Sequence, residues 1–580
     1  MINGDWVPKL KEPLPEPPSL LPDMIWQYLF LKGVRTQVEI DRIFSPSLKK
    51  LTYPFKILNM QKLVDRLVVA LDKGERICIY GDFDLDGTSG VVLLLKGLEG
   101  LGYKNLTYHQ PKRISEGYGV NLPSIQKLAD DGVNVIVTVD VGITDVLAAK
   151  KAKELGMDFI ITDHHLAKDV LPEAYTIVNP NQPECQSGLG FLCGAGVGFY
   201  VIMALKIQLE KISGQTIAYN SKDLLGYFTI ATLTDMVPLV KENRVLIKHG
   251  LMLLENSANP GIKALMDYLG MSGNKLTSSD IAIKFAPKLN ALSRLELDLL
   301  PIDIYLAEDA KSAKKLIKRM IQINEKRINI QRNAEAEAEK QLASMGVGSF
   351  VLVSSKSFHK GVIGLVATKL SKKHNVPAFI GAVGADGKVT GSSRLPNGNR
   401  SSLLEALSYA KDSLIRFGGH APAAGFLFDA SNEEQFRDLL TQYFEKEKKV
   451  KLEKSQQTIS YDVHGKLADL NEGFMKWYEQ LGPFGNAFEI PVFKFENLQL
   501  DKIKELKGGH LKLTFKDDDL RTKIDALWFS PPEGHNLCAG YESKINKVSL
   551  LCEPQWNYFN GRKTLQVLVQ EIQWDELKHV

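Results

Sequence analysis

Three short apolar runs in the first third of the chain predict parallel strands of one buried sheet. The runs cover residues 75–80 (ERICIY), 133–139 (VNVIVTV) and 158–162 (DFIIT), are rich in β-branched side chains and lack polar alternation, as expected for strands covered on both faces. The stretches between them, 89–103 and 143–157, have helical spacing and end near glycine. Strands that alternate with helices in this way predict an α/β fold with a doubly wound parallel sheet.

The middle of the chain predicts a long helix followed by a second α/β unit. Residues 308–345 contain no glycine or proline and carry apolar residues such as Met320 and Ile323 at helical spacing. Strand-like runs then follow at 350–355 and 377–383, with glycine-rich loops nearby. The long helix is therefore expected to connect two α/β units.

The last part of the chain predicts a small β-barrel. Runs with alternating apolar residues, such as 510–516 and 563–569, occur without long helices, and the pair Asn560-Gly561 predicts a hairpin turn. We expect five segments, which are an N-terminal cap at 1–50, a first α/β domain at 51–306, a connecting helix at 307–345, a second α/β domain at 346–445 and the barrel at 446–580.

The composition restricts any nucleic-acid site to local patches. The 580 residues include 72 basic and 68 acidic side chains, which gives a formal net charge of +4. The N-terminus has no basic region followed by an apolar core, and no apolar run reaches the roughly 20 residues of a membrane span. We therefore expect a cytoplasmic protein with no membrane association. Five cysteines without a C-x-x-C pair support neither a disulfide framework nor a zinc ribbon.

Two groups of residues have two interpretations each. Between Lys311 and Arg332 the predicted long helix carries eight basic residues and one acidic residue, Glu325. The basic residues are Lys311, Lys314, Lys315, Lys318, Arg319, Lys326, Arg327 and Arg332. They form either a solvated helix face or a surface that faces phosphates. The aromatic residues Trp556, Tyr558 and Phe559 either stack on nucleobases or pack in the barrel core.

Each of the three buried runs ends in carboxylates or histidines. The residues are Asp82, Asp84, Asp86, Asp140, Asp163, His164 and His165. Because the carboxyl ends of parallel strands meet at the same edge of a sheet, we expect these side chains to share one crevice. Asp235 follows an apolar helical segment and is expected to join them.

A cluster of this kind needs cations. Any single Asp after a strand is most simply a helix N-cap, because its side chain accepts hydrogen bonds from the next amides. Several carboxylates in one crevice repel one another, and bound divalent cations remove the repulsion. Oxygen ligands with one or two imidazoles suit Mn²⁺ or Mg²⁺. Two ions roughly 3.5 to 4 Å apart, bridged by a shared carboxylate, are the usual apparatus for in-line attack of a metal-activated water on phosphorus. The cluster therefore predicts a metal site.

Three glycine-rich loops of the second α/β unit carry His359, Ser392, Arg394 and His420. Glycine lets the backbone approach a ligand closely, although such loops are often only tight turns. A basic or imidazole group accompanies each loop, which suits the loops to bind phosphate.

Several motifs resemble a known family. YGDFDLDG, TVDVG, TDHH and ATLTDMVPL resemble the four ordered motifs of DHH phosphoesterases, and GGHAPAAG resembles the signature of the DHH-associated domain. RISEGYGVN, LCGAGVGF, APKLNALSR, KGVIGLVA, GSSRL and LGPFGNAFEIPVF resemble the RecJ family of bacterial single-stranded DNA exonucleases. The resemblance covers nearly everything from about Asn59 onward. It implies a parallel-sheet DHH domain and a second α/β DHH-associated domain joined by a long helix, plus a C-terminal OB-like β-barrel.

The resemblance also implies ligands for two ions, Mn²⁺ or Mg²⁺. Asp82 and Asp140 would hold one ion, whereas Asp84, Asp140, His164 and Asp235 would hold the other, with Asp140 bridging both. Asp140 would thereby take part in catalysis as well as in metal binding.

The same resemblance implies roles around the ions. His165 would be catalytic, beside the scissile phosphate, and would stabilise or protonate the departing oxygen, while Asp86 and Asp163 would orient the ligands. The residues expected to bind the phosphates of the DNA are Arg113, Asn290, Arg294, His359, Ser392, Arg394 and His420. Two positions depart from the family's pattern. Thr234 stands where a small apolar residue is usual, and Cys78 stands where some smaller relatives carry a histidine ligand, which leaves the first ion short of ligands.

The function expected from the resemblance is a metal-dependent 5′ to 3′ exonuclease that degrades single-stranded DNA to 5′ mononucleotides in recombination and repair. Single-stranded DNA is then the substrate, and a single-strand-binding protein and a helicase are the candidate partners. An alternative is a phosphodiesterase for short oligonucleotides or cyclic dinucleotides, which would not require the barrel or the basic helix. A third alternative is a DNA-binding scaffold with an inactive site, against which the intact set of acids and histidines argues.

Overall fold

The chain forms two compact units. The computed structural model describes residues 6–396, 398–399, 401–451, 459–517, 522–531, 547–559 and 562–574. One unit, called the barrel unit below, comprises Met1–Leu51, Met236–Lys248 and Gln456–Val580, and the other, the α/β unit, comprises Thr52–Asp235 and His249–Ser455. No helix in the described part of the chain is long and apolar enough to cross a membrane.

The first sheet of the α/β unit has five parallel strands in the order β3-β2-β4-β5-β6. The strands are β2 (Ile77–Gly81), β3 (Leu106–His109), β4 (Val135–Val139), β5 (Asp158–Thr162) and β6 (Thr176–Val178). β2 and β4 are buried along their whole length, which accounts for their lack of polar alternation. The predicted doubly wound α/β fold is confirmed.

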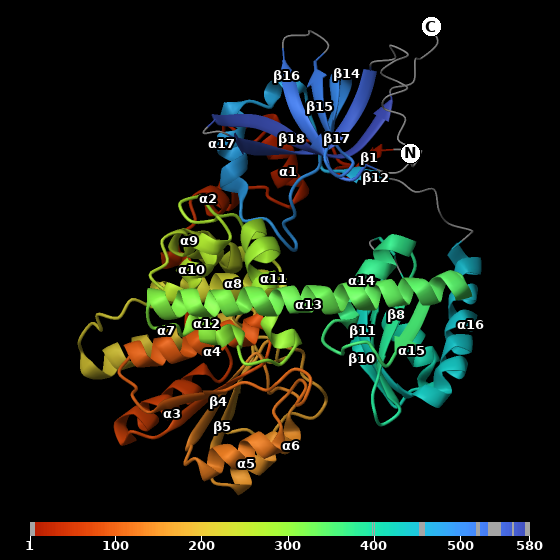
Figure 1. Cartoon of the computed structure of the whole chain (residues 1–580). Helices are drawn as coiled ribbons and strands as arrows, with labels where there is room; N and C mark the ends of the chain where they lie inside the picture. Colours follow the sequence, from red (N-terminus) through yellow and green to blue (C-terminus); the bar gives the residue numbers. More distant parts are fainter. Residues whose placement is uncertain are drawn as a thin grey trace. The chain divides into compact units, whose positions relative to one another are not determined.

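Helices cover both faces of this sheet (Figure 1). They are α3 (Met60–Lys73), α4 (Leu85–Gly100), α5 (Leu122–Asp130), α6 (Val146–Glu154) and α7 (Gly194–Ser213). α8 (Leu225–Asp235) packs on α4 and α7. Tyr80 and Ile136 belong to the core that α5 and α6 complete on one face, and α3, α4 and α7 contact the strands from the other. The chain continues through α9 (Lys241–Glu255), α10 (Pro260–Tyr268), a π-helical turn (Asp280–Phe285), α11 (Ala286–Asn290), the 3₁₀ turn η5 (Leu292–Arg294) and α12 (Pro301–Tyr305).

A single 36-residue helix, α13 (Ala310–Met345), leads to a second sheet. Asp309 begins the helix with a capping box to Ser312, and Met320 and Ile323 are buried as predicted. α13 contacts α10 and α12 near its start and α14 and β7 near its end. The predicted connecting helix is therefore present.

The second sheet has the order β10-β11-β9-β8-β7 and is parallel only between β7 and β8. The strands are β7 (Val351–Ser355), β8 (Ala378–Val383), β9 (Lys388–Arg394), β10 (Arg416–His420) and β11 (Ala423–Asp429). α13 and α14 (Ile363–His374) pack on one face, and α15 (Leu403–Tyr409) and α16 (Glu433–Lys451) pack on the other.

The barrel unit contains a closed five-stranded barrel. The strand order is β14-β15-β16-β18-β17, and β17 pairs back with β14, which is the closure expected of an OB-like barrel. The strands are β14 (Phe493–Leu506), β15 (His510–Lys516), β16 (Lys523–Trp528), β17 (Lys547–Phe559) and β18 (Arg562–Trp574), with β13 (Val463–His464) alongside β14 and the helix α17 (Glu472–Leu481) next to the barrel.

The N-terminal segment shares the barrel's core. α1 (Asp23–Leu31) and α2 (Gln37–Phe44) contribute buried residues such as Trp26 and Tyr28 to the same cluster as Phe495 and Val567. β1 (Trp6–Pro8) pairs with β12 (Ile459–Tyr461). The two ends of the chain thus build one hydrophobic core.

The structure shows the surroundings of one of the three aromatic residues, Trp556. Trp556 packs against the barrel core, donates its indole N–H to Glu479 and lies under the Lys563 ammonium, 4.0 Å from the ring centre. These contacts favour packing for this half-buried ring. The side chains of Tyr558 and Phe559 lie outside the described residues, as do Asn560-Gly561 and Cys538, although Phe559 and Arg562 on either side of the predicted turn pair in antiparallel register.

Candidate metal centre

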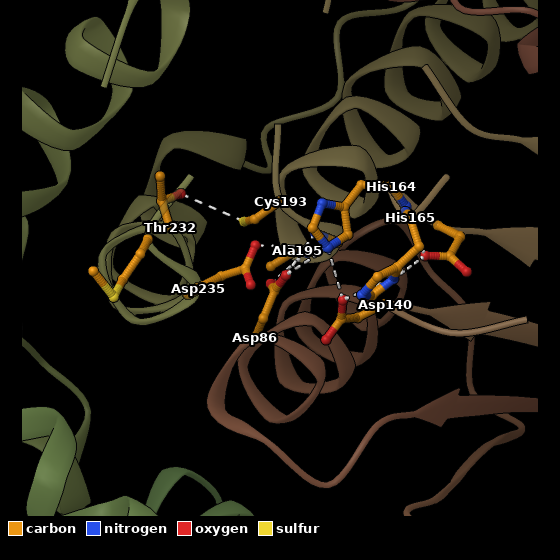
Figure 2. A network of polar contacts seen from close by, with 12 residues as sticks. Asp86, Asp140, His164, His165, Cys193, Ala195, Thr232 and Asp235 are labelled. Carbon is orange, nitrogen blue, oxygen red and sulfur yellow. Dashed lines mark hydrogen bonds and ion pairs between the residues drawn. The ribbon is translucent and has the colours of Figure 1, made fainter. Parts of the chain in front are cut away.

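Carboxylates and histidines from three strand ends and one helix end lie together at one edge of the first sheet. Figure 2 shows four of them, Asp140, His164, His165 and Asp235, with Asp86 beside them. Asp82 and Asp140 directly follow β2 and β4, His164 lies two residues after β5, and Asp235 ends α8. His164 Nε2 lies 3.1 Å from Asp140 Oδ1 and 3.6 Å from Asp235 Oδ2. The structure therefore brings together the side chains that the sequence placed in one crevice.

Glycines allow two helices to press against the backbone of this cluster. A Cβ atom on Gly87, in the first turn of α4, would lie 2.5 Å from the Asp82 carbonyl oxygen, and one on Gly194, at the start of α7, would lie 2.4 Å from Asp140 Cβ. Asp140 itself has a φ of 64°, which is unfavourable for a residue other than glycine. Close packing of α4 and α7 thus fixes the two carboxylates.

The carboxylates of Asp84 and Asp86 accept hydrogen bonds from amides at helix N-termini. Asp84 is the N-cap of α4, and its Oδ1 accepts hydrogen bonds from the amides of Asp86 and Gly87 at 2.8 and 3.0 Å. The carboxylate of Asp86 accepts from the amides of Gly194 and Ala195, at 2.6 and 2.8 Å, where α7 begins. Asp84 is therefore an N-cap and a member of the cluster at once, and α7 fixes the orientation of Asp86.

The cluster fits divalent cations. Three groups of side chains offer ligand atoms within 4.8 Å of one another, and they are Asp82/Asp84/Asp140, Asp140/His164/His165 and Asp86/His164/Asp235. Within the described part of the chain, Asp82 Oδ1 and Asp235 Oδ2 are buried without a hydrogen-bond donor, which is unfavourable unless a cation meets them. Carboxylate oxygens with an imidazole are the ligands of Mn²⁺ and Mg²⁺, and Asp140 is shared between groups, as a bridging ligand would be.

Crowding and burial change the protonation of these groups. Burial, together with the charge of Asp84, raises the pKa of Asp82 to about 8. Burial, together with Asp86 and Asp84, raises the pKa of Asp235 to about 8 and that of Asp140 well above its usual range. Without cations the cluster therefore keeps protons at neutral pH.

His165 differs from these carboxylates, because its surroundings favour its charged form. Burial alone would lower its pKa, but the hydrogen bond from its Nδ1 to Asp163 Oδ1 at 2.8 Å raises the pKa to about 9. Asp163 also accepts hydrogen bonds from the amides of Ile143, His164 and His165. His165 is thus held as a proton donor at neutral pH, whereas burial lowers the pKa of His164 and favours the neutral imidazole that a metal ion requires.

Three of the expected phosphate-binding residues form an arginine cluster. Arg113 lies over the Phe83 ring, 4.9 Å from its centre. Arg294 donates to the Gly361 carbonyl at 3.2 Å, and Arg394 donates to Ser392 Oγ at 3.0 Å. Burial and the charges of Arg113, Arg327 and Arg394 lower the pKa of Arg294 to about 10. The structure thus brings Arg113, Arg294 and Arg394 close enough to repel one another.

The remaining expected phosphate ligands lie at different distances from this cluster. His359 Nδ1 accepts from the Gly361 amide at 3.1 Å, beside Arg294, and Ser392 contacts Arg394. Asn290 ends α11, and its carbonyl accepts from the hydroxyl of Ser293. His420 lies exposed at the end of the edge strand β10, and none of its hydrogen bonds in the described part of the chain joins it to the other expected ligands.

Two residues at the site were not predicted. Glu296, at a φ of 46°, accepts from the amides of Ile114 and, at 3.0 Å, Ser115, and so holds the loop that carries Arg113. The Tyr118 hydroxyl lies 3.4 Å from His165 Nδ1, and the residue is 52% exposed. The glycines on either side of Tyr118 mark a turn in the sequence, but nothing there reveals that Glu296 folds back onto this loop.

Cys78 and Thr234, the two residues that depart from the family's pattern, both lie within regular secondary structure. Cys78 is fully buried in β2 among the residues that face α5 and α6, and burial raises the pKa of its thiol to about 12. The Thr234 hydroxyl donates to the carbonyls of Ile230 and Ala231 within α8. Cys78 belongs to none of the three ligand groups of the described residues.

Comparisons with known proteins identify relatives of this chain. The family models described as "DHH family, N-terminal domain", "DHHA1 domain" and "RecJ OB domain" match residues 76–232, 347–446 and 461–571. The chain is 29% identical over 575 residues to the single-stranded-DNA-specific exonuclease RecJ of Salmonella typhimurium, covering 96% of this chain and 97% of that protein. It is 30% identical over 523 residues to the exonuclease of the same name from Bacillus subtilis, covering 89% and 64%.

Solved structures share the fold. RecJ from Thermus thermophilus, in complex with Mn²⁺, superposes with a TM-score of 0.75 at 23% identity, covering 96% of this chain and 76% of that one. An exonuclease RecJ bound to manganese superposes with a TM-score of 0.55 at 29% identity, covering 67% and 95%. From the order of the three domains, the carboxylate cluster and these relatives, the chain belongs to the RecJ family of the DHH superfamily.

Proposed function

We propose that this protein is a metal-dependent exonuclease that degrades single-stranded DNA from the 5′ end to 5′ mononucleotides, in DNA recombination and repair. The observation that carries the proposal is the cluster of Asp82, Asp140, His164 and Asp235, with two buried carboxylate oxygens that lack donors. The relatives named single-stranded-DNA-specific exonucleases, similar over nearly the whole chain, support this substrate.

Each side chain of the cluster has a place in this proposal. Asp82 and Asp140 would hold one ion, and Asp84, Asp140, His164 and Asp235 would hold the second. Ions bound there supply an activated water and neutralise charge at the phosphorus. Asp86 and Asp163 keep the ligands and His165 in position through the hydrogen bonds that they accept.

The chain's own acid and arginines complete the reaction. His165, which keeps its proton at neutral pH, would donate it to the departing oxygen, and Asp163 stabilises the protonated ring. Arg113, Arg294 and Arg394 would bind phosphates of the strand. The further phosphate contacts proposed are Asn290, His359, Ser392 and His420.

The cellular setting is also proposed. A single-strand-binding protein and a helicase would supply single-stranded DNA, and the reaction would take place in the cytoplasm. The barrel at 446–580 would hold the strand beyond the cleavage site together with the cap at 1–50, while the domains at 51–306 and 346–445, connected by 307–345, would carry the chemistry.

An end-labelling experiment tests the proposal. A long single strand labelled at its 5′ or 3′ end, a duplex with a 5′ single-stranded tail, a blunt duplex and a dinucleotide are incubated with Mn²⁺, Mg²⁺ or EDTA. We expect early release of the 5′ label, removal of the tail, resistance of the blunt duplex and no reaction in EDTA. A strong preference for the dinucleotide, with the 5′ label released no earlier than the 3′ label, contradicts the exonuclease and favours the phosphodiesterase.

A further inference from the structure

Asp235 is held differently from the other carboxylates of the metal centre. Backbone amides donate hydrogen bonds to the carboxylates of Asp84, Asp86 and Asp163. Asp235 Oδ2, by contrast, is buried without a hydrogen-bond donor among the described residues. Asp235 is the last residue of α8, and its carboxylate points toward His164, 3.6 Å away (Figure 2). The position of Asp235 therefore depends on the backbone at the end of α8.

The chain passes from the α/β unit into the barrel unit directly after Asp235. Met236, the first residue of the barrel unit's central segment, has a φ of 58°. This left-handed conformation is disfavoured by roughly tenfold in population for a residue other than glycine. Met236 is 71% exposed, so burial of its side chain does not stabilise the conformation. Other contacts must hold the backbone at this point.

A turn of the barrel unit, residues 485–488, supplies these contacts. Asn486 Nδ2 donates to the carbonyl oxygen of Met236 at 2.8 Å, and the Asn486 carbonyl accepts from the amide of Leu239 at 2.8 Å. The side chain of Leu239 is buried against Gly485, where a Cβ atom would lie 2.7 Å from Leu239 Cδ1. Asn486 thus holds the backbone that follows the metal ligand at two points.

The turn is itself fixed within the barrel unit. Its first and last residues exchange two backbone hydrogen bonds, at 3.0 and 3.1 Å. The guanidinium of Arg244, on α9, lies 3.7 Å from the centre of the Phe488 ring. The same guanidinium donates to the carbonyls of Leu481 and Pro483, at 2.5 and 2.7 Å. Because Leu481 and Phe488 belong to the barrel's hydrophobic core, the contacts of the turn depend on a folded barrel unit.

We propose that Asn486 is a positioning residue for the metal ligand Asp235, and that the folded barrel unit thereby raises the affinity of the centre for the ion that Asp235 holds. The inference rests on the proposed function in one respect, the assignment of Asp235 as a ligand. Without the Asn486 contact, Met236 relaxes from its left-handed φ and Asp235 turns away from His164. The apparent affinity for the ion then falls with the fraction of molecules that keep the competent conformation.

The test compares Asn486→Ala with the matched control Asn471→Ala. Asn471 also hydrogen-bonds the backbone within the barrel unit, because it caps α17 by accepting from the amide of Phe474 at 3.1 Å. Binding of Mn²⁺ to the full chain is measured by calorimetry in the absence of DNA. For Asn486→Ala we expect an affinity about five- to tenfold weaker for one of the two ions. For Asn471→Ala we expect an affinity within about twofold of the parent's for both ions.

A second substitution tests the part played by the backbone. Asparagine adopts a left-handed φ more readily than methionine, and the side chain of Met236 is exposed. Met236→Asn in the Asn486→Ala background should therefore restore the Mn²⁺ affinity to within about twofold of the parent's. A double variant that binds Mn²⁺ as weakly as Asn486→Ala overturns the positioning role.

Kinetics distinguish positioning from a general loss of structure. Hydrolysis of single-stranded DNA by Asn486→Ala should be reduced at low Mn²⁺ concentration and should return to the parent's kcat at saturating Mn²⁺, with an unchanged KM for DNA. A kcat that stays low at saturating Mn²⁺ contradicts the inference.

The outcomes also separate this inference from the proposed function. An Mn²⁺ affinity of Asn486→Ala within twofold of the parent's, or an equal loss in Asn486→Ala and Asn471→Ala, overturns the positioning role alone. If the parent binds Mn²⁺ but does not degrade single strands, the proposed function is wrong, and the Mn²⁺ affinities still decide the role of Asn486. If the parent binds no Mn²⁺, both are wrong.

Discussion

Metal binding should release protons, because the metal-free cluster holds them. Asp82 and Asp235 each have a pKa of about 8 through burial and neighbouring carboxylates. At pH 7 a group with that pKa is roughly 90% protonated, and the proton must leave when the oxygen binds a cation. His164 contributes no proton, because its pKa is lowered. Asp140, a ligand whose pKa burial and neighbouring carboxylates also raise, adds to this release. We therefore expect at least two protons to be released per protein loaded with Mn²⁺ at pH 7.

The sign of the pH dependence follows from the raised pKa values. Below the folded-state pKa, each proton that metal binding releases makes the Mn²⁺ affinity rise about tenfold, or ~1.4 kcal/mol, for each unit by which the pH increases. Two protons give roughly a 100-fold gain between pH 6 and pH 7, and the gain ends above about pH 8. In the metal-free protein the same raised pKa values stabilise the folded state. This stabilisation is fully present below the pKa of the unfolded chain, near 4, and is lost as the pH rises through the folded-state value of about 8.

Calorimetry in buffers of different ionisation enthalpy measures the released protons directly. Asp235→Asn should lower the release at pH 7 by about one proton. The control Asp65→Asn, at an exposed carboxylate on α3 that accepts from Gln61, should leave it unchanged. Binding heats that do not depend on the buffer at pH 7, or an Mn²⁺ affinity that stays constant from pH 6 to pH 8, would refute the electrostatic reasoning.

Four substitutions or deletions test other parts of the structure. Asp140→Ala should reduce DNA hydrolysis more than about 100-fold while circular dichroism stays unchanged, and near-parent activity with Mn²⁺ would contradict its bridging role. Gly87→Ala should cost about 1 to 3 kcal/mol in urea unfolding, because its Cβ would meet the Asp82 backbone; an unchanged midpoint would contradict this packing. Glu296→Gln should raise KM with little change in kcat by loosening the Arg113 loop, and an equal fall in kcat would argue for a different role. Deletion of residues after Val450 should give aggregation, since Trp26 would lose the core that covers it, and a monodisperse product in light scattering would contradict the shared core.

Most of the metal cluster could be predicted from the sequence because its chemistry is local. Asp82, Asp140 and His164 each follow a buried apolar run, and parallel strands necessarily place such ends at the same edge. Asp235 could be predicted only because it ends an apolar helical segment within a recognisable motif. The sequence shows no sign that Asp86 binds the start of α7, because that contact joins residues more than 100 positions apart.

The features that sequence reasoning missed depend on long-range packing. Periodicity cannot distinguish Arg327 from Arg332, since burial of a basic residue on α13 depends on where η5 lies. Glu296 turns back toward the Arg113 loop through a left-handed φ that no glycine marks. The aromatic residue Trp556 was equally suited to stacking and to packing until its partner Glu479 was known.

The shared core of the two chain ends has a consequence for how the protein is made. Lys9 pairs with Asp462 at 2.9 Å, and α1 (Asp23–Leu31) is covered by strands that are synthesised much later, from Phe493 onward. At roughly 5 to 20 residues per second, the ribosome needs on the order of 20 to 90 s to reach the barrel after α1 has emerged. During that interval the apolar face of α1 remains exposed, because the barrel strands that cover it have not been made, while the α/β unit folds. The nascent chain is therefore a natural client for chaperones that shield early hydrophobic helices, and slow closure of the barrel is expected to be the final step of folding.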